Sequence, residues 1–530
     1  MTLDVSSIMF VDVDQFYGIE IEDFPSQIAQ VALWMTDHQM NLKVSEEFGQ
    51  YFARLPLKKA PNIVHGNALT IDWCSIVAPA DLSYIVGNPP FIGKQHQDEA
   101  QKAELVSLFA GTKDAGLLDY VCAWYRKAVR YMLGNTAIRA ALVSTNSIVQ
   151  GEQVSAFWPV VLRDGLVITF AHRTFQWASE ARGQATVQCV IVGFALEEVD
   201  EKWIFEYENP RGEAHAIKAS HINAYLVDAP DVFLENRRDA ICDVPAIVWG
   251  SMPNEGGHLL LTNEEKVELL AAEPAAKTFL RRFVGADEFL YDTKRWCIWL
   301  VGVAPERFRS LSAIKARVQS VRHYRLASKR EATKKLADVP MLFGEVRQPD
   351  ESYLLIPAHT SETRRYIPFG YMQADVICGN ANLLIPGASL YHMGVLSSEM
   401  HMAWVRAVCG RLESRYRYSA GIVYNNFPWP EPNGKQRAAV EKTAQSVLDA
   451  RAAAKGSSLA DLYDPLSTPA AVLKAHQALN KAVDAAYGKT SFAKEVERVA
   501  HLFELYRQIT APLDVAAPKK LRKAARKATA

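Results

Sequence analysis

Short apolar runs alternate with helical segments through residues 8–194, and this alternation restricts the fold more than any other feature of the sequence. Apolar, strand-like runs occur at 17–22, 62–69, 82–87, 139–148 and 185–194. Between them, residues such as 117–133 place apolar side chains at helical spacing, while "VITFAHRTF" adds another β-rich run. Strands that alternate with helices predict an α/β fold with a mainly parallel sheet and helices on both faces.

The remaining sequence changes character after residue 206. Pro and Gly become frequent and strand signals become short, apart from a long helical stretch at 306–336. Residues 427–435 read as a turn-rich linker before an Ala-rich helical region. With 530 residues, about three domains are expected. The predicted domains are a partial catalytic domain at 1–206, a mixed α/β domain at 207–432 and a helical domain at 433–512, with a basic flexible tail at 513–530.

Composition restricts the class of protein only weakly. Lys+Arg and Asp+Glu number 59 each, so a nucleic-acid binder with this balance must concentrate its basic residues locally. Seven scattered cysteines without a CxxC pair predict a reducing cytoplasm, no disulfide framework and no metal site. No apolar run approaches the ~18 residues of a membrane span, so no membrane partner is expected.

The most informative stretch is "LSYIVGNPPFIGKQ", in which a strand runs into Asn88, Pro89, Pro90 and Phe91. Prolines lack the donor that a central strand needs, so the strand must end there in a stiff turn. In an open sheet, ligands lie beyond the carboxyl ends of the strands. The Asn88 side-chain oxygen and the Pro89 carbonyl can then accept both hydrogens of an exocyclic amine, which makes its nitrogen a better nucleophile towards a methyl group. Phe91 offers a flat face for a base; a plain turn is the alternative.

Together with other runs, this motif resembles a known family. "NPPF" after an apolar strand is motif IV of amino-methylating DNA methyltransferases. With "DQFYGIEIEDFPSQIAQVALWMTDHQMN", "LDYVCAWYRKA", "VSTNSIVQGEQV", "FAHRTFQW" and "NNFPWPEP", it resembles the MmeI-like type IIL restriction–modification enzymes over residues 8–510. The resemblance implies a class I S-adenosylmethionine-dependent methyltransferase sheet, then a target-recognition domain and a helical C-terminal region. NPPF alone is less specific, because protein-glutamine and ribosomal RNA methyltransferases share it.

The resemblance also implies roles for particular residues. Glu20, with Ile21, matches the acid that binds the ribose of S-adenosylmethionine, and Asn67, with Ala68, stands where an Asp often contacts the cofactor adenine. Asn88 completes this cofactor-binding set. Phe175 resembles the aromatic that stacks on the flipped base, although Trp177 or Phe91 are alternatives. A solvent-facing role for Glu20 and a turn-shaping role for Asn67 remain open.

Two features depart from the family pattern. Members carry a glycine-rich motif I before the "YGIE" strand, yet no Gly precedes Gly18 here. The nuclease cluster of the family also has no counterpart. The resemblance therefore implies a methyltransferase sheet without its first strand, and a separate N-terminal or nuclease polypeptide as a possible partner.

Basic residues gather in the second domain, which predicts contact with double-stranded DNA. Eight basic residues face one acid over 315–335, a charge run that is otherwise a solvated helix face. In "CGRLESRYRYS", an extended chain would point Arg411, Glu413, Arg415 and Arg417 to one side, with Glu413 and Arg415 as base readers or as a surface ion pair. The predicted DNA-binding residues are Arg322, Arg325, Lys329, Arg330, Arg364, Arg365, Glu413, Arg415 and Arg417.

The expected function is site-specific methylation of adenine N6 in DNA. An inactive DNA-binding specificity fragment is the main alternative, because motif I is absent. Cytosine N4 is not excluded by the chemistry of the loop, and methylation of protein or RNA is disfavoured by the large second domain.

Overall fold

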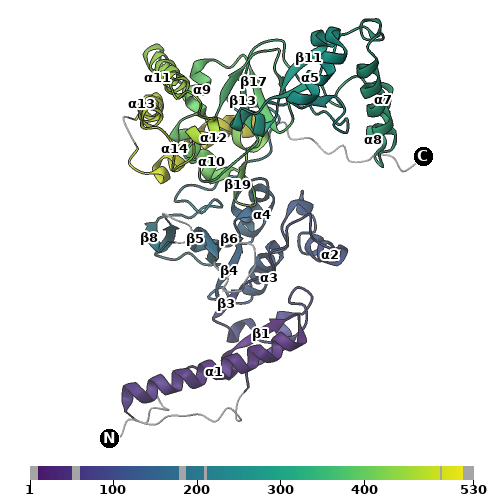
Figure 1. Cartoon of the computed structure of the whole chain (residues 1–530). Coiled ribbons are helices and arrows are strands. Elements are labelled where there is room, and N and C mark those ends of the chain that lie inside the picture. Colours follow the sequence, from purple (N-terminus) through teal and green to yellow (C-terminus); the bar gives the residue numbers. More distant parts are fainter. Residues whose placement is uncertain (1–9, 50–59, 178–186, 208–211, 490–491, 517–530) are drawn as a thin grey trace, which may run out of the picture. The chain divides into compact units, whose positions relative to one another are not determined.

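A computed structural model of the chain describes residues 10–49, 60–177, 187–207, 212–489 and 492–516. The chain divides into two compact units (Figure 1). Unit 1 comprises residues 1–148 and 156–222, and unit 2 comprises residues 149–155 and 223–530. Within the described ranges, no helix is both long and apolar enough to cross a membrane. Most of the predicted basic tail, from residue 517 on, lies outside the described residues.

Unit 1 contains two sheets and four α-helices among its described residues. A two-stranded parallel sheet pairs β1 with β2, and a six-stranded sheet has the order β3-β4-β6-β5-β7-β8. The elements are β1 (Tyr17–Glu20), α1 (Asp23–Phe48), β2 (Asn62–His65), β3 (Tyr84–Gly87), α2 (Glu99–Leu108), α3 (Cys122–Met132), β4 (Arg139–Thr145), α4 (Gln153–Arg163), β5 (Val167–Trp177), β6 (Val187–Ala195), β7 (Lys202–Tyr207) and β8 (Ala214–Ala219).

The α/β class predicted from the sequence is confirmed, and four of the six strands of the larger sheet, β3, β4, β5 and β7, point the same way, whereas β6 and β8 run opposite to them. Only β3 with β4 and β5 with β7 run parallel there, while the other three pairings are antiparallel. The reason is that β6 enters the sheet between β4 and β5 rather than after β5. Local periodicity predicted β1 to β6 but missed β7 and β8, and it carries no information about the order in which strands pair.

The strand β3 forms one edge of the larger sheet. Its side chains are strongly exposed, at 70% for Tyr84 and 80% for Val86. Within the described residues, β1 pairs only with β2, and no strand connects β1 to β3. An apolar strand exposed along an unpaired edge is unusual, because it offers free backbone groups and apolar area to another chain.

The core of unit 1 is aromatic and lies where α3 and α4 meet the sheet. Tyr125 of α3 stacks on Phe194 of β6 with ring centroids 5.3 Å apart, and it meets Phe157 of α4 edge-on at 5.4 Å. The Tyr125 hydroxyl bonds the Ser144 hydroxyl at 2.8 Å, so its polar end is satisfied. This packing fixes α3 and α4 against β4 and β6, and β4 is the neighbour of β3 in the sheet.

Unit 2 is mixed α/β followed by helices. Its three sheets have the orders β10-β12-β11-β16, β15-β13-β17-β9 and β14-β19-β18. The elements are β9 (Val248–Trp249), β10 (Leu260–Leu261), α5 (Asn263–Ala272), β11 (Leu280–Val284), α6 (Ala286–Tyr291), β12 (Arg295–Ile298), α7 (Ser312–Leu326), α8 (Glu331–Lys335), β13 (Tyr353–Pro357), β14 (His359–Thr360), β15 (Gly370–Met372), β16 (Ile377–Cys378), β17 (Asn382–Pro386), α9 (Leu390–Leu396), α10 (Glu399–Val408), β18 (Arg411–Leu412), β19 (Arg415–Arg417), α11 (Gly434–Ala453), α12 (Leu459–Leu462), α13 (Ala470–Ala486) and α14 (Glu495–Ala516).

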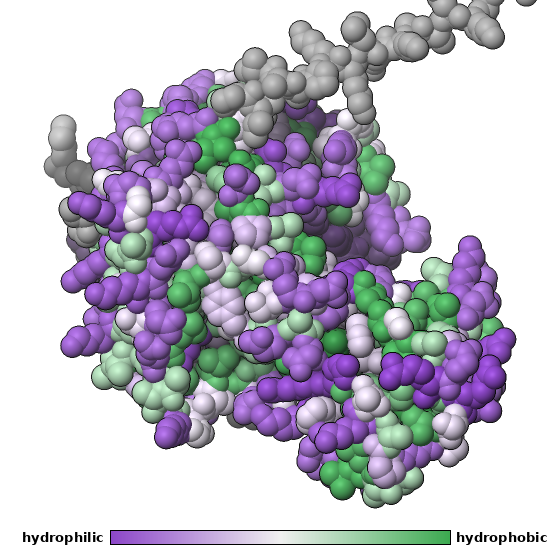
Figure 2. All heavy atoms as spheres, turned by 90° about the horizontal axis from the view of Figure 1, so that it is seen from above, coloured by the Kyte–Doolittle hydropathy of each residue, from purple (hydrophilic) through white to green (hydrophobic). Residues whose placement is uncertain are grey.

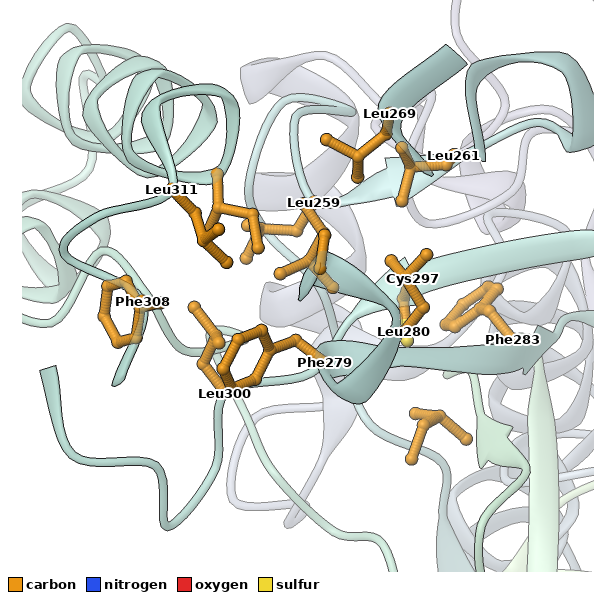
Figure 3. Packing of buried hydrophobic residues seen from close by; sticks show 14 of the residues in the cluster. Leu259, Leu261, Leu269, Phe279, Leu280, Phe283, Cys297, Leu300, Phe308 and Leu311 are labelled. Atoms are coloured by element: carbon orange, nitrogen blue, oxygen red, sulfur yellow. The ribbon is translucent and has the colours of Figure 1, made fainter. Parts of the chain in front are cut away.

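A hydrophobic cluster supports the part of unit 2 that carries α7. Side chains such as Leu259, Phe279, Phe283 and Leu300 meet there, and Leu311 joins them from the start of α7 (Figure 3). On the face drawn in Figure 2, by contrast, hydrophilic residues surround small groups of hydrophobic ones. Ile314 and Val321 of α7 belong to this cluster, so one face of α7 is buried against it.

Candidate catalytic loop and DNA-recognition surface

The Asn88 loop begins where β3 ends, as the sequence predicts. β3 stops at Gly87, Asn88 is exposed, Pro89 is buried and Phe91 is half-buried. β4 runs parallel beside β3, with Gly87 opposite Leu142, so the carboxyl ends of both strands lie at one edge of the sheet. Within the described residues, the Asn88 side chain makes no hydrogen bond to the protein. Its carboxamide is therefore available to a ligand at the carboxyl end of the sheet.

Glu20 lies at the carboxyl end of β1, where a cofactor-binding acid is expected. Its side chain is half-buried, and one carboxylate oxygen lies 3.3 Å from the Glu22 amide, which donates to it. Its backbone carbonyl accepts from the Gly66 amide at 2.8 Å, which ties β1 to the turn after β2. Ile21 is exposed beside it. A carboxylate held in this way keeps acceptor capacity for a pair of hydroxyl groups.

Asn67 has turn-shaping contacts, the alternative that the sequence leaves open beside a cofactor contact. Its side-chain oxygen accepts from the Leu69 amide at 2.8 Å, and its side-chain nitrogen donates to Glu104 Oε1 at 2.7 Å. The other Glu104 oxygen accepts from the Tyr120 hydroxyl. Burial and the neighbouring Glu104 raise the pKa of Tyr120, so this hydroxyl stays protonated and donating. Ala68 is half-buried, and its carbonyl accepts from an indole nitrogen, that of Trp73, at 2.9 Å.

Phe175 belongs to an aromatic cluster on β5 and β7. Its ring stacks on Tyr207 at 5.4 Å between centroids, and His172 stacks on Phe205 at 4.2 Å. The Tyr207 hydroxyl and His172 Nδ1 are hydrogen-bonded at 2.8 Å, and burial lowers the pKa of His172. Tyr207 and His172 thus support the ring that the sequence marks as a base-stacking candidate. The side chain of Trp177 lies outside the described residues.

The basic run of residues 315–335 is not one helix. α7 ends at Leu326, and α8 begins at Glu331. Arg322, Lys329 and Arg330 are exposed, as a DNA-contacting role requires. Other members of the run are used internally, since Arg317 pairs with Glu265 at 3.0 Å and Lys334 with Glu331 at 2.6 Å. The predicted continuous positive stripe is therefore wrong. The exposed basic residues stand at three places: Lys315 early in α7, Arg322, Lys329 and Arg330 around the end of α7, and Lys335 at the end of α8.

Arg325 does not fit the predicted role in DNA binding. Its side chain is 0% exposed, and the guanidinium donates to five backbone carbonyls at 2.7–3.4 Å. These carbonyls belong to Pro253, Asn254, Leu336, Val339 and Leu342. The side chain joins α7 to two other segments and is withheld from any ligand. The correct interpretation is structural.

Arg364 and Arg365 differ in their availability. Arg365 forms an ion pair with Glu399 at 2.6 Å, and Arg406 also contacts this carboxylate at 3.3 Å. These cations hold the pKa of Glu399 below its usual range despite burial, which by itself raises it. Arg364 is half-buried and donates to the Thr360 hydroxyl at 3.2 Å. Arg365 is thus largely committed to the fold, whereas Arg364 has only a weak neutral partner.

The segment "RLESRYR" is a tight hairpin rather than one extended strand. Leu412 pairs with Arg415, so Glu413 and Ser414 form the turn, and Glu413 has a positive φ of 57°. Residues that pair across antiparallel strands share a face, so Arg411 lies with Tyr416, at 3.8 Å from its ring, and away from Arg415 and Arg417. The prediction that all four charges point to one side is therefore wrong. Glu413 and Arg415 do form an exposed ion pair at 2.8 Å.

The fold and the loop together define a methyltransferase-type catalytic unit that precedes a DNA target-recognition unit. The model of the MmeI DNA-methyltransferase domain matches residues 3–206, that of the MmeI target recognition domain matches 228–431, and that of the MmeI C-terminal domain matches 432–514. The solved structure of the type IIL restriction–modification enzyme MmeI in complex with DNA is 50% identical, with a TM-score of 0.84, over 96% of this chain and 68% of that chain. The chain belongs to the MmeI family of DNA methyltransferases.

A curated relative supports the same assignment. DNA methyltransferase A of Bacillus subtilis (strain 168) is 37% identical over 505 residues, which is 94% of this chain. The chain spans 56% of the length of that relative.

Proposed function

We propose that this chain transfers a methyl group from S-adenosylmethionine to the N6 amine of adenine in duplex DNA. The observation that carries the proposal is the exposed Asn88 carboxamide at the carboxyl end of β3, followed by two prolines, in a chain of the MmeI family. Asn88 Oδ1 and the Pro89 carbonyl accept the two amine hydrogens. The amine lone pair is then less delocalised into the ring and better aligned for attack. The N–C bond forms as the bond between the methyl carbon and the sulfonium sulfur breaks, S-adenosylhomocysteine leaves, and one amine proton passes to solvent.

Flipping the target adenine out of the DNA helix requires favourable contacts for the base in its new position. Unstacking and unpairing cost roughly a few kcal/mol, and each aromatic stacking partner returns ~1–3 kcal/mol. Phe91 follows the catalytic residues directly and is half-buried. Phe175 rests on Tyr207, so one of its faces is supported by the protein. These two rings are the proposed stacking partners.

The residues near β1 and β2 fit the adenosine end of S-adenosylmethionine. The Glu20 carboxylate is half-buried at the carboxyl end of β1 and already orders one backbone amide, so it suits the ribose hydroxyls. Ile21, Asn67 and Ala68 flank this position, with Asn67 acting chiefly through the turn that it holds. When bound, S-adenosylmethionine supplies the electrophilic methyl group. No metal is part of the proposed chemistry.

The proposed DNA contacts lie in unit 2. Arg322, Lys329 and Arg330 provide exposed positive charge for phosphates, and Arg364 adds a weakly partnered guanidinium. Glu413, Arg415 and Arg417 at the hairpin are the proposed base readers, because Arg suits guanine and Glu suits cytosine in the major groove. Arg325 is excluded by its burial, and Arg365 is exposed but already pairs with Glu399, so it is the less favoured contact.

Transfer of labelled methyl groups tests the proposal. The 530-residue chain is incubated with labelled S-adenosylmethionine and unmethylated genomic DNA, and the digested nucleosides are identified by mass spectrometry. N6-methyladenine is the expected product. Asn88→Ala should abolish this product. Gln95→Ala, a substitution at an exposed position a few residues further along the chain, should not. N4-methylcytosine, or methylation of added RNA or protein alone, would refute the proposed substrate.

One observation favours the alternative that the chain binds DNA without catalysis. Among the described residues, β1 and β3 have no strand between them, and Tyr84 and Val86 are exposed. The two candidate cofactor-binding regions are therefore not joined by a continuous sheet. Calorimetric titration with S-adenosylmethionine separates the two: micromolar binding supports the enzyme, and absence of heat with retained DNA binding supports a specificity subunit completed by a separate polypeptide.

A further inference from the structure

We infer that Asp119 is a positioning residue for the catalytic loop, an inference that rests on the proposed function. Asp119 lies in the segment just before α3 and contacts the loop that follows Phe91. The residue is 8% exposed, and a carboxylate is rarely buried to this extent unless it has strong partners. Asp119 belongs to the run "LDYVCAWYRKA" just before α3, but its residue type and spacing alone assign it no role.

The Asp119 carboxylate contacts two segments that follow the ends of adjacent parallel strands. Oδ1 accepts from the Lys94 amide at 3.2 Å, and Oδ2 accepts from the Ser147 hydroxyl at 2.5 Å. Lys94 lies beyond β3 and the catalytic motif, and Ser147 lies beyond β4. One carboxylate therefore bridges the loops at the carboxyl ends of β3 and β4, which is the edge where the substrate base must be held.

Neighbours of Asp119 strengthen the same connection through backbone groups. The Tyr120 amide donates to the Ile92 carbonyl at 2.9 Å, directly after Phe91. The Gln97 side chain, itself buried, donates to the Leu118 carbonyl at 3.0 Å. The segment from Ile92 to Gln97 is thus fixed to residues 118–120 at three places. Because Asn88 and Pro89 have a stiff connection to Ile92 through Pro90 and Phe91, this anchor sets where their acceptors point.

Asp119 is therefore not a reacting group. It fixes the positions of two acceptors, Asn88 Oδ1 and the Pro89 carbonyl. A misplacement of about 1 Å in the reacting geometry lowers turnover by about 100-fold. Substrate affinity depends on many other contacts and should change little. Loss of the anchor is therefore expected to lower kcat and to leave KM for S-adenosylmethionine nearly unchanged.

Four variants of the full chain test the inference by two readouts. Asp119→Ala removes the carboxylate. Asp119→Asn keeps an acceptor oxygen and adds an N–H group that can donate to the Ser147 oxygen. Ser147→Ala removes the hydroxyl contact to Asp119 and also the contact of Ser147 with the Thr145 hydroxyl at 2.6 Å, but leaves the contact of Asp119 with the Lys94 amide. Asp98→Ala is the matched control, because this nearby carboxylate caps α2 through the Gln101 amide at 2.8 Å and does not contact the loop. Hydrogen–deuterium exchange of the peptide 91–97 is measured beside methyl transfer.

The expected order is set by the contacts. Asp119→Ala should speed exchange at the Lys94 amide by about 10- to 100-fold, because a hydrogen bond to a charged acceptor is lost, and should lower kcat by a similar factor. Asp119→Asn should keep the exchange rate at Lys94 and kcat within about fivefold of the wild type. Ser147→Ala should give values between those of the two Asp119 variants. Asp98→Ala should speed exchange in α2 but not at Lys94.

The two readouts separate failure of this inference from failure of the proposed function. If the wild-type chain shows no methyl transfer, the exchange experiment alone decides whether Asp119 fixes the loop. Unchanged exchange at 91–97 in Asp119→Ala overturns the inference. Faster exchange throughout β5 and β6 as well also overturns it, because Asp119 would then support the whole unit rather than the loop. So does a wild-type kcat in a folded Asp119→Ala enzyme.

Discussion

Replacement of Arg325 by Met should destabilise unit 2 without removing a DNA contact. Met has a similar reach and no donor, so the substitution leaves five backbone carbonyls without the guanidinium that they share. A hydrogen bond to a charged group contributes about 1.5–3 kcal/mol, and each buried group left unpaired costs about 1–3 kcal/mol. These terms are not additive, and breaking a buried hydrogen-bond network is among the few kinds of substitution that cost about 4 kcal/mol.

A loss of about 4 kcal/mol gives a measurable change in unfolding temperature. At roughly 2–4 °C per kcal/mol for a large domain, Arg325→Met should unfold about 8–16 °C lower than the wild type. Scanning calorimetry measures the transition, and the fluorescence of Trp299, which packs against the cluster beside α7, assigns it to this part of unit 2. At temperatures well below the transition, the affinity for DNA should equal that of the wild type.

Arg322→Ala is the matched control on the same helix. Arg322 is exposed, so its loss should change the unfolding temperature by less than about 2 °C, since surface substitutions usually stay within ±0.5 kcal/mol. It should weaken DNA binding and reduce the salt dependence by about one counterion. The reasoning is refuted if Arg325→Met unfolds like the wild type, or if it weakens DNA binding in the manner of Arg322→Ala.

Three further predictions concern the hairpin residue Glu413, the aromatic residue Phe175 and two buried histidines. Glu413→Ala should leave stability within about 1 kcal/mol, because its ion pair with Arg415 is exposed, yet it should alter the methylated sequence, as read by sequencing of modified sites. Phe175→Leu should reduce the fluorescence rise of 2-aminopurine at the target position, which reports base flipping, while an unchanged rise would point to Phe91 as the main stacking ring. Burial lowers the pKa of His401 and of His476 to about 3 in the fold. The unfolded chain, with a pKa near ~6.5, takes up the protons first, so stability should fall below about pH 6.5, by about 2 kcal/mol per histidine at pH 5, and His401→Gln should flatten that slope.

The position of the Asn88 loop at the end of β3 was predictable because its cause is local. A strand that runs into Asn88 and two prolines must end, and the end of a strand in an α/β sheet is a ligand site. Asp119 and Glu104 were not predictable in this way, because they lie 25 and 37 residues from their partners Lys94 and Asn67. Only the packing of α2 and α3 brings these groups together.

Two of the wrong predictions in unit 2, Arg325 as a DNA contact and the extended strand at 411–417, have different physical origins. Arg325 follows the buried Val321 by one helical turn, so the 3.6-residue period placed it on the inner face, and charge alone obscured that signal. The hairpin at Glu413 and Ser414 carries neither Gly nor Asn, the residues that usually mark such turns. Glu413 nevertheless adopts a positive φ, so the turn is set by the pairing of β18 with β19 and of β19 with β14.

The hairpin also explains how recognition can change without loss of the fold. Along β19, Arg415 and Arg417 are exposed, whereas Tyr416 between them is buried and packs under the Arg411 guanidinium. The inward side chains hold the hairpin, and the outward ones, with Glu413 at the turn, make no contact that the core requires. Substitutions at the outward positions should therefore alter which DNA sequence is bound at little cost in stability, while Tyr416→Ala should lower stability and weaken binding to every sequence alike.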